Sequence, residues 1–250
     1  IVGYRQGTKV YIVGSKIYMN PTSNYMFAAK NSWEAPLWSS LTEINGLDYL
    51  DCSRVTSIDY MFQYNLALTE LDLSSWDTSN VTSMEMVFNG CLNLETIDVS
   101  TWNTSKVKTF CAMFQGTSWK GDMKLKNIDV SKWDTSSATN MGHVFYGCGA
   151  LTEIDVSNWG TNSLENTFAT FFQCDNLTTI KGINNLNMSK VLIHYCYIFI
   201  AYGSLYIISR KQLVVSHIIS FDTHKSSIMI CFCITVSSFT TNFNVFCVTF

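Results

Sequence analysis

Four aspartates recur along the chain at nearly constant intervals, and of all its residues they come closest to a set that could act together. They are Asp72, Asp98, Asp129 and Asp155. Calcium binds several oxygen ligands at once, so a row of carboxylates is a pattern that could hold it. Each interval supplies one carboxylate, however, and the chain has no glycine-rich calcium loop. We therefore interpret the aspartates as solvated, or as hydrogen-bonded to neighbouring Ser and Thr hydroxyls, and predict no metal site and no cofactor.

The residues most often used in catalysis form no recognisable set. The four histidines are His143, His194, His217 and His224. His143 occupies a variable position of the repeat described below, and the other three lie in an atypical C-terminal segment. The chain contains no Gly-x-Ser-x-Gly elbow, phosphate-binding loop or HExxH motif. The sequence therefore predicts that the protein is not an enzyme.

Nine cysteines are present, but none forms a CxxC pair, and Cys231 and Cys233 are spaced only as CxC. Zinc-finger spacing is therefore absent. Cys148 and Cys174 are one repeat apart, which is close enough for a disulfide if the repeats stack. We expect instead buried free thiols that pack as small apolar residues, as free cysteine usually does.

The elements that would position these residues repeat along the chain. Strand-like tripeptides at residues 71–73, 97–99, 128–130 and 154–156 place their aspartates 26, 31 and 26 residues apart, and we place the extra residues of the middle interval near 119–123. Three other residue types keep the same spacing: Trp76, Trp102, Trp133 and Trp159; Phe62, Phe88, Phe114, Phe145 and Phe171; and Cys91, Cys148 and Cys174. A fixed period of this kind indicates units that stack on one another.

Each unit contains a strand-like segment, a turn and a segment with helical spacing. Residues 71–74 alternate apolar and polar, which is typical of a strand with one buried face. Residues 76–80 are turn formers. Val81, Met84 and Phe88 then occupy one face of a short predicted helix.

The ends of this predicted helix also carry helical signals. Thr82 and Glu85 are spaced like a capping box, and Gly90 can end the helix in a left-handed conformation. We therefore predict an α/β fold: a right-handed leucine-rich-repeat solenoid with one short parallel strand and one short helix per 26-residue turn. In such a fold the repeated phenylalanines form a single interior column.

The repeated tryptophans have two interpretations. If they are exposed, they form an aromatic strip suited to sugar rings or to partner proteins. If they cover the corner between strand and helix, they pack in the core, and this is the interpretation that we favour.

The repeat resembles that of the BspA-type leucine-rich-repeat surface proteins. The resemblance is carried by LDLSSWDTSNVTSMEMVFNGCLNL at residues 71–94 and by IDVSKWDTSSATNMGHVFYGCGAL at residues 128–151, and it extends over residues 41–191. Residues 9–27 are similar to the segment that precedes such repeats. The resemblance implies a bacterial or protist cell-surface protein used in adhesion and protein binding, and it implies no catalytic residues.

We divide the chain into three segments. Residues 1–40 are predicted to form a β-rich N-terminal cap, and residues 41–191 to form the solenoid. Both prolines precede the repeats, as continuous backbone ladders require. The chain starts at Ile1 without a signal peptide, so we expect a mature or truncated fragment of a surface protein.

Residues 192–250 form an atypical hydrophobic tail in which the repeat pattern stops within a motif. Three interpretations remain open. The tail is a frame-shifted or prematurely ended reading frame, a membrane anchor, or a divergent packed cap. Uncharged runs at 191–209 and 226–250 are long enough for membrane spans, but they contain scattered polar residues and little leucine.

The composition and the repeat together predict a binding function. The net charge of −3 and the lack of a basic patch argue against nucleic acid as a partner. We expect a cell-surface, extracellular module that binds extracellular or host proteins or glycans through its extended strand face, with membrane association only through the tail. The alternative is a structural spacer or stalk of a larger surface protein. The candidate ligand-binding residues are the outward strand positions Glu70, Asp72, Ser74, Asp98, Ser100, Asp129, Ser131, Glu153, Asp155 and Ser157.

Overall fold

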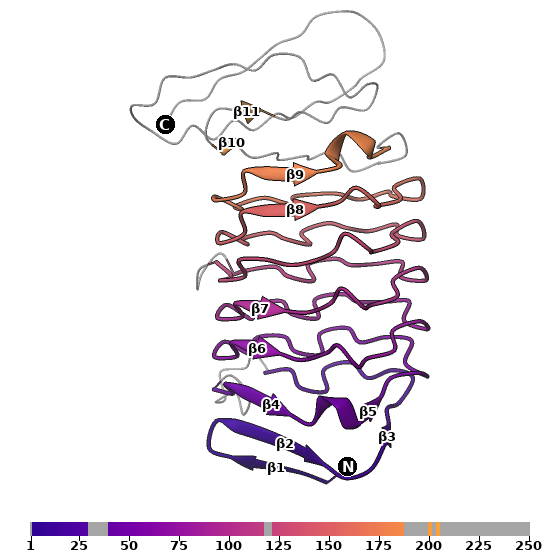
Figure 1. Cartoon of the computed structure of the whole chain (residues 1–250), viewed down its shortest axis with the longest axis vertical. Coiled ribbons are helices and arrows are strands. Elements are labelled where there is room, and N and C mark those ends of the chain that lie inside the picture. Colours follow the sequence, from indigo (N-terminus) through magenta and orange to yellow (C-terminus); the bar gives the residue numbers. More distant parts are fainter. Residues whose placement is uncertain (1, 30–39, 118–121, 188–199, 202–203, 206–250) are drawn as a thin grey trace, which may run out of the picture.

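Successive turns of the chain stack along one axis (Figure 1). The computed structural model describes residues 2–29, 40–117, 122–187, 200–201 and 204–205. Within these residues it contains short strands, loops and two 3-10 helices, and no α-helix. The elements are β1 (Val2–Gln6), β2 (Lys9–Val13), β3 (Ile17–Tyr18), β4 (Glu43–Asn45), η1 (Leu47–Tyr49), β5 (Leu50–Asp51), β6 (Glu70–Leu71), β7 (Thr96–Ile97), β8 (Glu153–Asp155), β9 (Thr179–Lys181), η2 (Ile183–Asn185), β10 (Ile200–Ala201) and β11 (Ser204–Leu205).

The turns are stacked in parallel and in register. β6 pairs with β7 and β8 with β9, so that Glu70 lies opposite Thr96 and Glu153 opposite Thr179. A second line of parallel contacts runs along another side of the stack through single bridges, joining Thr22, Ser57, Ser83, Thr109, Asn140 and Asn166 in that order. The bridged positions inside the repeats differ by the same 26 or 31 residues as the aspartates, so the sequence period is the period of the stack.

The predicted short helix is wrong. The amides of Met84, Met86 and Phe88 donate to carbonyl groups of the following turn instead of to residues within their own turn. The hydroxyl of Thr82 also does not cap a helix, because it donates to the carbonyl of Thr56 in the preceding turn, 3.0 Å away. The segment is therefore a series of turns that hydrogen-bonds to the neighbouring turns of the stack, with a parallel bridge at Ser83.

A left-handed residue in each turn explains why the sequence pattern looked helical. Met86 has a φ of 54°, and the equivalent residues of the other turns have φ values between 54° and 60°. These residues are Tyr25, Tyr60, Ala112, His143 and Ala169. The left-handed residue lies between the buried side chains Met84 and Val87, which are three residues apart in this non-helical segment.

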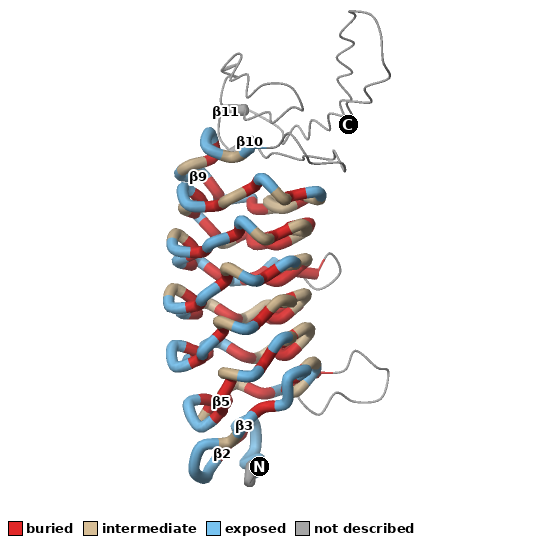
Figure 2. Tube along the Cα trace, turned by 90° about the vertical axis from the view of Figure 1, so that its right-hand side faces the viewer, coloured by how far each residue is buried: buried red, intermediate tan, exposed pale blue. Residues whose placement is uncertain are grey.

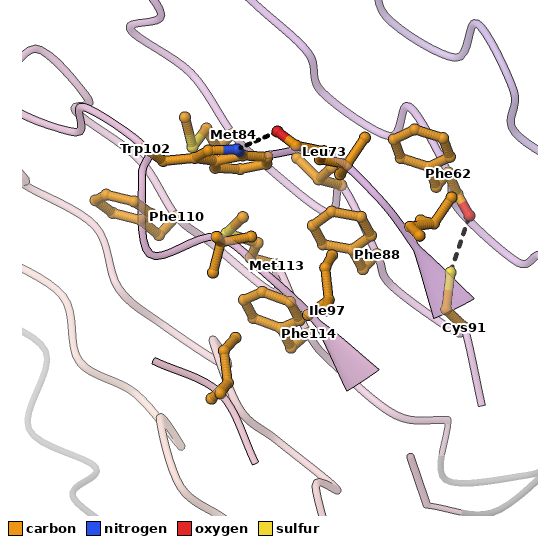
Figure 3. Packing of buried hydrophobic residues seen from close by; sticks show 14 of the residues in the cluster. Phe62, Leu73, Met84, Phe88, Cys91, Ile97, Trp102, Phe110, Met113 and Phe114 are labelled. Carbon is orange, nitrogen blue, oxygen red and sulfur yellow. Dashed lines mark hydrogen bonds between the residues drawn. The ribbon is translucent and has the colours of Figure 1, made fainter. Parts of the chain in front are cut away.

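The predicted phenylalanine column is confirmed. The ring centroids of Phe62, Phe88, Phe114, Phe145 and Phe171 follow one another at 5.6, 5.2, 5.5 and 5.6 Å, and Phe27 extends the column at the N-terminal end. Figure 3 shows three of these rings in sequence beside Ile97 and Met113. Fully burying each such ring contributes about 1.5–3 kcal/mol. Figure 2 shows the result for the described turns, with buried residues on the inside of each turn and exposed ones at its outer edges.

The tryptophans pack in the core, as expected. Trp76, Trp102, Trp133 and Trp159 are all buried. Each indole Nε1 donates to a backbone carbonyl one turn earlier, for example from Trp102 to Leu73 at 3.4 Å (Figure 3). The side chain thus fills the corner of the turn, and its one polar atom joins two turns.

The cysteines of the repeat are buried free thiols, as the sequence predicts. Cys148 and Cys174 do not form a disulfide. The thiols of Cys91, Cys148 and Cys174 each point to the carbonyl of the column phenylalanine one turn earlier, at 3.0–3.2 Å. Burial raises the pKa of Cys91 and of Cys174 to about 12, so these thiols are poor nucleophiles.

The β-rich N-terminal segment closes one end of the stack. β1 and β2 form an antiparallel hairpin, and β2 continues into the stack by pairing in parallel with β4. β3 pairs in the same way with β5. Residues 2–18 of the predicted cap are thus rich in strands, whereas residues 30–39 lie outside the described residues.

The first and last described turns share a variant shape. In both, a glycine with positive φ follows the strand and a 3-10 helix comes next, η1 after Gly46 and η2 after Gly182. Beyond this turn the structure describes only the short antiparallel pair β10 and β11. The other residues of the predicted hydrophobic tail lie outside the described part of the chain. Among the residues that the structure describes, no helix is long and apolar enough to cross a membrane.

Candidate binding face

Two rows of outward side chains flank each inward aliphatic residue of the strand face. The inward residues are Ile44, Leu71, Ile97, Ile128 and Ile154, all buried. The residue before each of them forms one row: Glu43, Glu70, Thr96, Asn127 and Glu153. The residue after each of them forms the other row: Asn45, Asp72, Asp98, Asp129 and Asp155. The period-2 alternation of strands thus puts both polar rows on the outside.

The aspartates of the second row are held in one conformation by the chain that follows. The Oδ1 atom of Asp98 accepts hydrogen bonds from the amide of Ser100 at 3.0 Å and from its hydroxyl at 2.7 Å. Asp72 and Asp129 make the same pair of bonds with Ser74 and Ser131. The expectation that these carboxylates bond to neighbouring hydroxyls is therefore confirmed for three of the four.

Asp155 differs from the others because it accepts only the amide of Ser157, at 2.9 Å. In all four cases the hydrogen bonds from the following serine lower the pKa of the aspartate below its ordinary value. These four aspartates are therefore ionised at neutral pH.

An open groove with a volume of about 1070 Å³ runs along this face across the strands β4, β6, β7, β8 and β9. Eight of the ten candidate ligand-binding residues line it: Glu70, Asp72, Asp98, Ser100, Asp129, Ser131, Glu153 and Asp155. Ser74 and Ser157 are exposed but do not line the groove. They donate hydrogen bonds to Asp72 and Asp155, respectively. The predicted residues are thus brought together on one continuous surface.

Sequence reasoning missed several lining residues. They are Glu43, Asn45, Thr96, Asn127 and Lys181, together with the nearly buried aliphatic residues that form the floor. The signal that could have found them is the strand alternation itself, since every one of the polar residues stands next to an inward aliphatic position.

Ion pairs occur at the two ends of this face. Lys9 bonds to Glu43 at the N-terminal end, and Lys181 lies 3.2 Å from Glu153 at the C-terminal end. Among the described residues no ion pair involves Glu70, Asp72, Asp98 or Asp129, which line the groove between these ends. Lys132 is close enough to Asp98 and Asp129 to lower the pKa of both, but it forms no ion pair with either, so the middle of the groove carries net negative charge.

Other chemically active groups of the described chain do not build a second site. No cluster of three or more His, Cys, Asp or Glu side chains in the described ranges could hold a metal ion. His143 is half-buried against the rings of Tyr146 and Phe168, and its burial lowers the pKa of the imidazole. Its position on the bridged segment at Asn140 places it outside the residues that line the groove.

The fold and this face together define a protein of stacked repeats with an open acidic groove along one side. Residues 23–128 and 117–202 match the family described as "Mycoplasma protein of unknown function, DUF285", and the chain belongs to this family.

A comparison with solved structures gives a leucine-rich repeat protein from Bacteroides ovatus ATCC 8483, with 18% sequence identity and a TM-score of 0.16. The match covers 69% of this chain and 59% of that chain, so the chain spans less than two thirds of that protein's length. No curated protein sequence matches the chain.

Proposed function

We propose that this chain is a leucine-rich-repeat solenoid of the BspA type and that it is a non-enzymatic binding module. Its strand face binds extracellular or host proteins, or glycans, at a cell surface. The observation that carries the proposal is the groove, where outward side chains of five strands meet on one surface. A surface that is long and open suits an extended macromolecular ligand better than a small substrate, which needs an enclosing pocket.

The fixed aspartates support the same conclusion. Because the Oδ1 atoms of Asp72, Asp98 and Asp129 are already held by serines, these side chains lose little conformational freedom when a ligand binds. Groups that are pre-organised in this way add to affinity by lowering the entropic cost of association.

The second candidate is a structural spacer. The continuous phenylalanine column favours it, because an unbroken core that runs through every turn gives a rigid body. The two functions differ in what they require of the strand face. A binding module depends on its outward residues, whereas a spacer tolerates their replacement.

The experiment that separates them compares two sets of surface variants of the full chain. The first is Asp72→Asn/Asp98→Asn/Asp129→Asn, which removes charge from the groove. The second is Asp77→Asn/Asp134→Asn. Each of these aspartates also accepts a hydrogen bond from the amide of the serine two residues later, but neither lines the groove. Asn103 already makes this bond with Ser105 at the equivalent position, so asparagine preserves the turn.

Binding is measured on immobilised panels of purified extracellular-matrix proteins and glycans. We expect at least one ligand that the wild type and the Asp77/Asp134 variant bind alike and that the groove variant binds about tenfold more weakly, a change that corresponds to about 1.4 kcal/mol. Equal binding by all three proteins, or no ligand in either panel, would favour the spacer.

A further inference from the structure

The charge on the groove is strongly one-sided. Its lining contains the seven carboxylates of Glu43, Glu70, Asp72, Asp98, Asp129, Glu153 and Asp155, and the single lysine Lys181. Lys9 and Lys181 form ion pairs at the two ends, and Lys132 attracts Asp98 and Asp129 without pairing with either, so the net negative charge lies between the ends. Asp98 is close enough to Asp72, and Asp129 to Asp98, for each pair to repel. A cationic ligand would relieve this repulsion.

Each aspartate keeps one oxygen available for such a ligand. The serine bonds occupy Oδ1, and in the described chain Oδ2 of Asp72, Asp98, Asp129 and Asp155 has no hydrogen-bond partner. The groove therefore offers a row of acceptor oxygens in fixed positions, one for each turn. The spacing of that row decides which ligand fits it.

Neighbouring strands of a sheet are about 4.8 Å apart, so every second turn is about 9.6 Å away. A polyproline II helix rises about 3.1 Å per residue with three residues per turn, so every third side chain lies on one face at intervals of about 9.3 Å. Cationic side chains at every third residue of such a peptide would therefore meet the aspartates of alternate turns, with a mismatch of only about 0.3 Å per contact.

Other regular conformations fit less well. Same-face residues of a β-strand are about 6.7 Å apart, which falls between one turn and two. A helical ligand repeats about every 5.4 Å along its axis, so it drifts from the row by about 1.2 Å over two turns. The match therefore favours the polyproline II conformation over both alternatives.

The floor of the groove suits the remaining residues of such a peptide. Leu71, Ile97 and Ile128 line the groove with 6–9% of their surface exposed. These side chains form an apolar strip between the two polar rows, against which proline rings would pack. Proline also fixes the extended conformation before binding, which lowers the entropic cost.

We infer that the groove binds an extended, polyproline II polypeptide that carries Lys or Arg at every third residue and lies along the axis of the stack. This inference rests on the proposed binding function and names its ligand class. Two registers are available to the peptide: its cations meet either Asp72 and Asp129 or Asp98 and Asp155.

The two registers allow a test that compares two variants of equal net charge. The probe is a capped peptide of four Pro-Pro-Lys repeats, and its control has the same composition with lysine at every second residue. The full chain is compared with Asp98→Asn/Asp129→Asn, which interrupts both registers, and with Asp72→Asn/Asp129→Asn, which leaves the Asp98 and Asp155 register intact. Binding is measured by fluorescence anisotropy at low and at physiological salt.

We expect the spaced probe to bind the wild type about fivefold to tenfold more tightly than the control peptide, as a few exposed ion pairs would provide. The Asp98→Asn/Asp129→Asn variant, which interrupts both registers, should lose most of this difference in affinity. The Asp72→Asn/Asp129→Asn variant should lose only about a factor of two. Equal losses in the two variants, or equal affinity for the two peptides, would overturn the spacing argument and leave the binding function standing. The matrix and glycan panels test that function separately, because their outcome does not depend on the peptide.

Discussion

At the scale of single residues, the serine-bonded aspartates of the groove link the chemistry of the strand face to its shape. Oδ1 of Asp72, Asp98 and Asp129 accepts the hydroxyl of the serine two residues later, and all three aspartates line the groove. The alternation of polar and apolar residues was sufficient to predict that these aspartates point outward and bond to hydroxyls. It did not predict that a groove would form between the two outward rows, because this depends on how the turns stack.

These aspartates should make the stability of the fold depend on pH in the acidic range. The serine hydrogen bonds lower the pKa of Asp72, Asp98 and Asp129 in the folded chain. Their contribution to stability is therefore present above the unfolded pKa of about 3.9 and is lost as the pH falls through the folded values. In thermal denaturation between neutral and strongly acidic pH, we expect Tm to fall less steeply below about pH 4 for the triple asparagine variant than for the wild type. Parallel pH profiles for the two proteins would argue against this assignment.

At the scale of elements, the one serious misreading of the sequence is the helix in each repeat. Buried residues three apart were taken for helical periodicity, but in the structure the same spacing occurs in a series of turns that contains a left-handed residue. Non-glycine residues such as Met86 and His143 rarely adopt this conformation, so their residue types gave no signal. The hydrogen bonds to the next turn, which hold the strained residue, depend on residues 25 or 30 positions further along the chain, as from Met86 to Cys111 and from Ala112 to Gly142.

Gly90 was correctly predicted to be left-handed, with a φ of 73°, although it ends a loop and not a helix. A Cβ atom at this position would lie 2.5 Å from Cδ1 of Tyr64. We expect Gly90→Ala to destabilise the fold by about 2 kcal/mol or more, because backbone strain of about 1 kcal/mol is joined by a steric clash.

The matched control is Gly7→Ala. Gly7 has a φ of 60°, but a Cβ atom there would meet nothing within 4 Å. In denaturant unfolding, Gly7→Ala should lower the free energy of unfolding only by the backbone strain, about 1 kcal/mol. If both substitutions cost the same, the contact between Tyr64 and Gly90 is not what selects glycine.

At the scale of the whole molecule, the stacking of like residues was the most predictable feature, since four residue types keep one period. The spacing alone was sufficient to predict which side chains stack on one another, and the phenylalanine column confirms this prediction. The hydrogen bonds that join the turns through buried Trp and Thr side chains were not predicted. Thr104, for example, donates to the carbonyl of Asp134 in the following turn, although its sequence context is that of an exposed turn.

The column makes a quantitative prediction about stability. Phe114 is fully buried between Phe88 and Phe145, so Phe114→Ala should lower the free energy of unfolding by about 3–5 kcal/mol. The same substitution at Phe171, which is only half-buried, should cost clearly less. Chemical denaturation of both variants provides the comparison, and a loss at Phe171 as large as that at Phe114 would contradict the assigned order of burial.

The uniform hydrogen bonding from one turn to the next also bears on how genes of this kind can change in length. Since every turn presents the same donors and acceptors to its neighbours, a recombination event that excised residues 84–109 would join Ser83 to Phe110, the residue that stands where Met84 stood. The rejoined chain would keep every column in phase. Copies of such a gene can thus gain or lose whole units by unequal crossing-over, and the length of the binding surface becomes a trait that varies while the architecture stays the same.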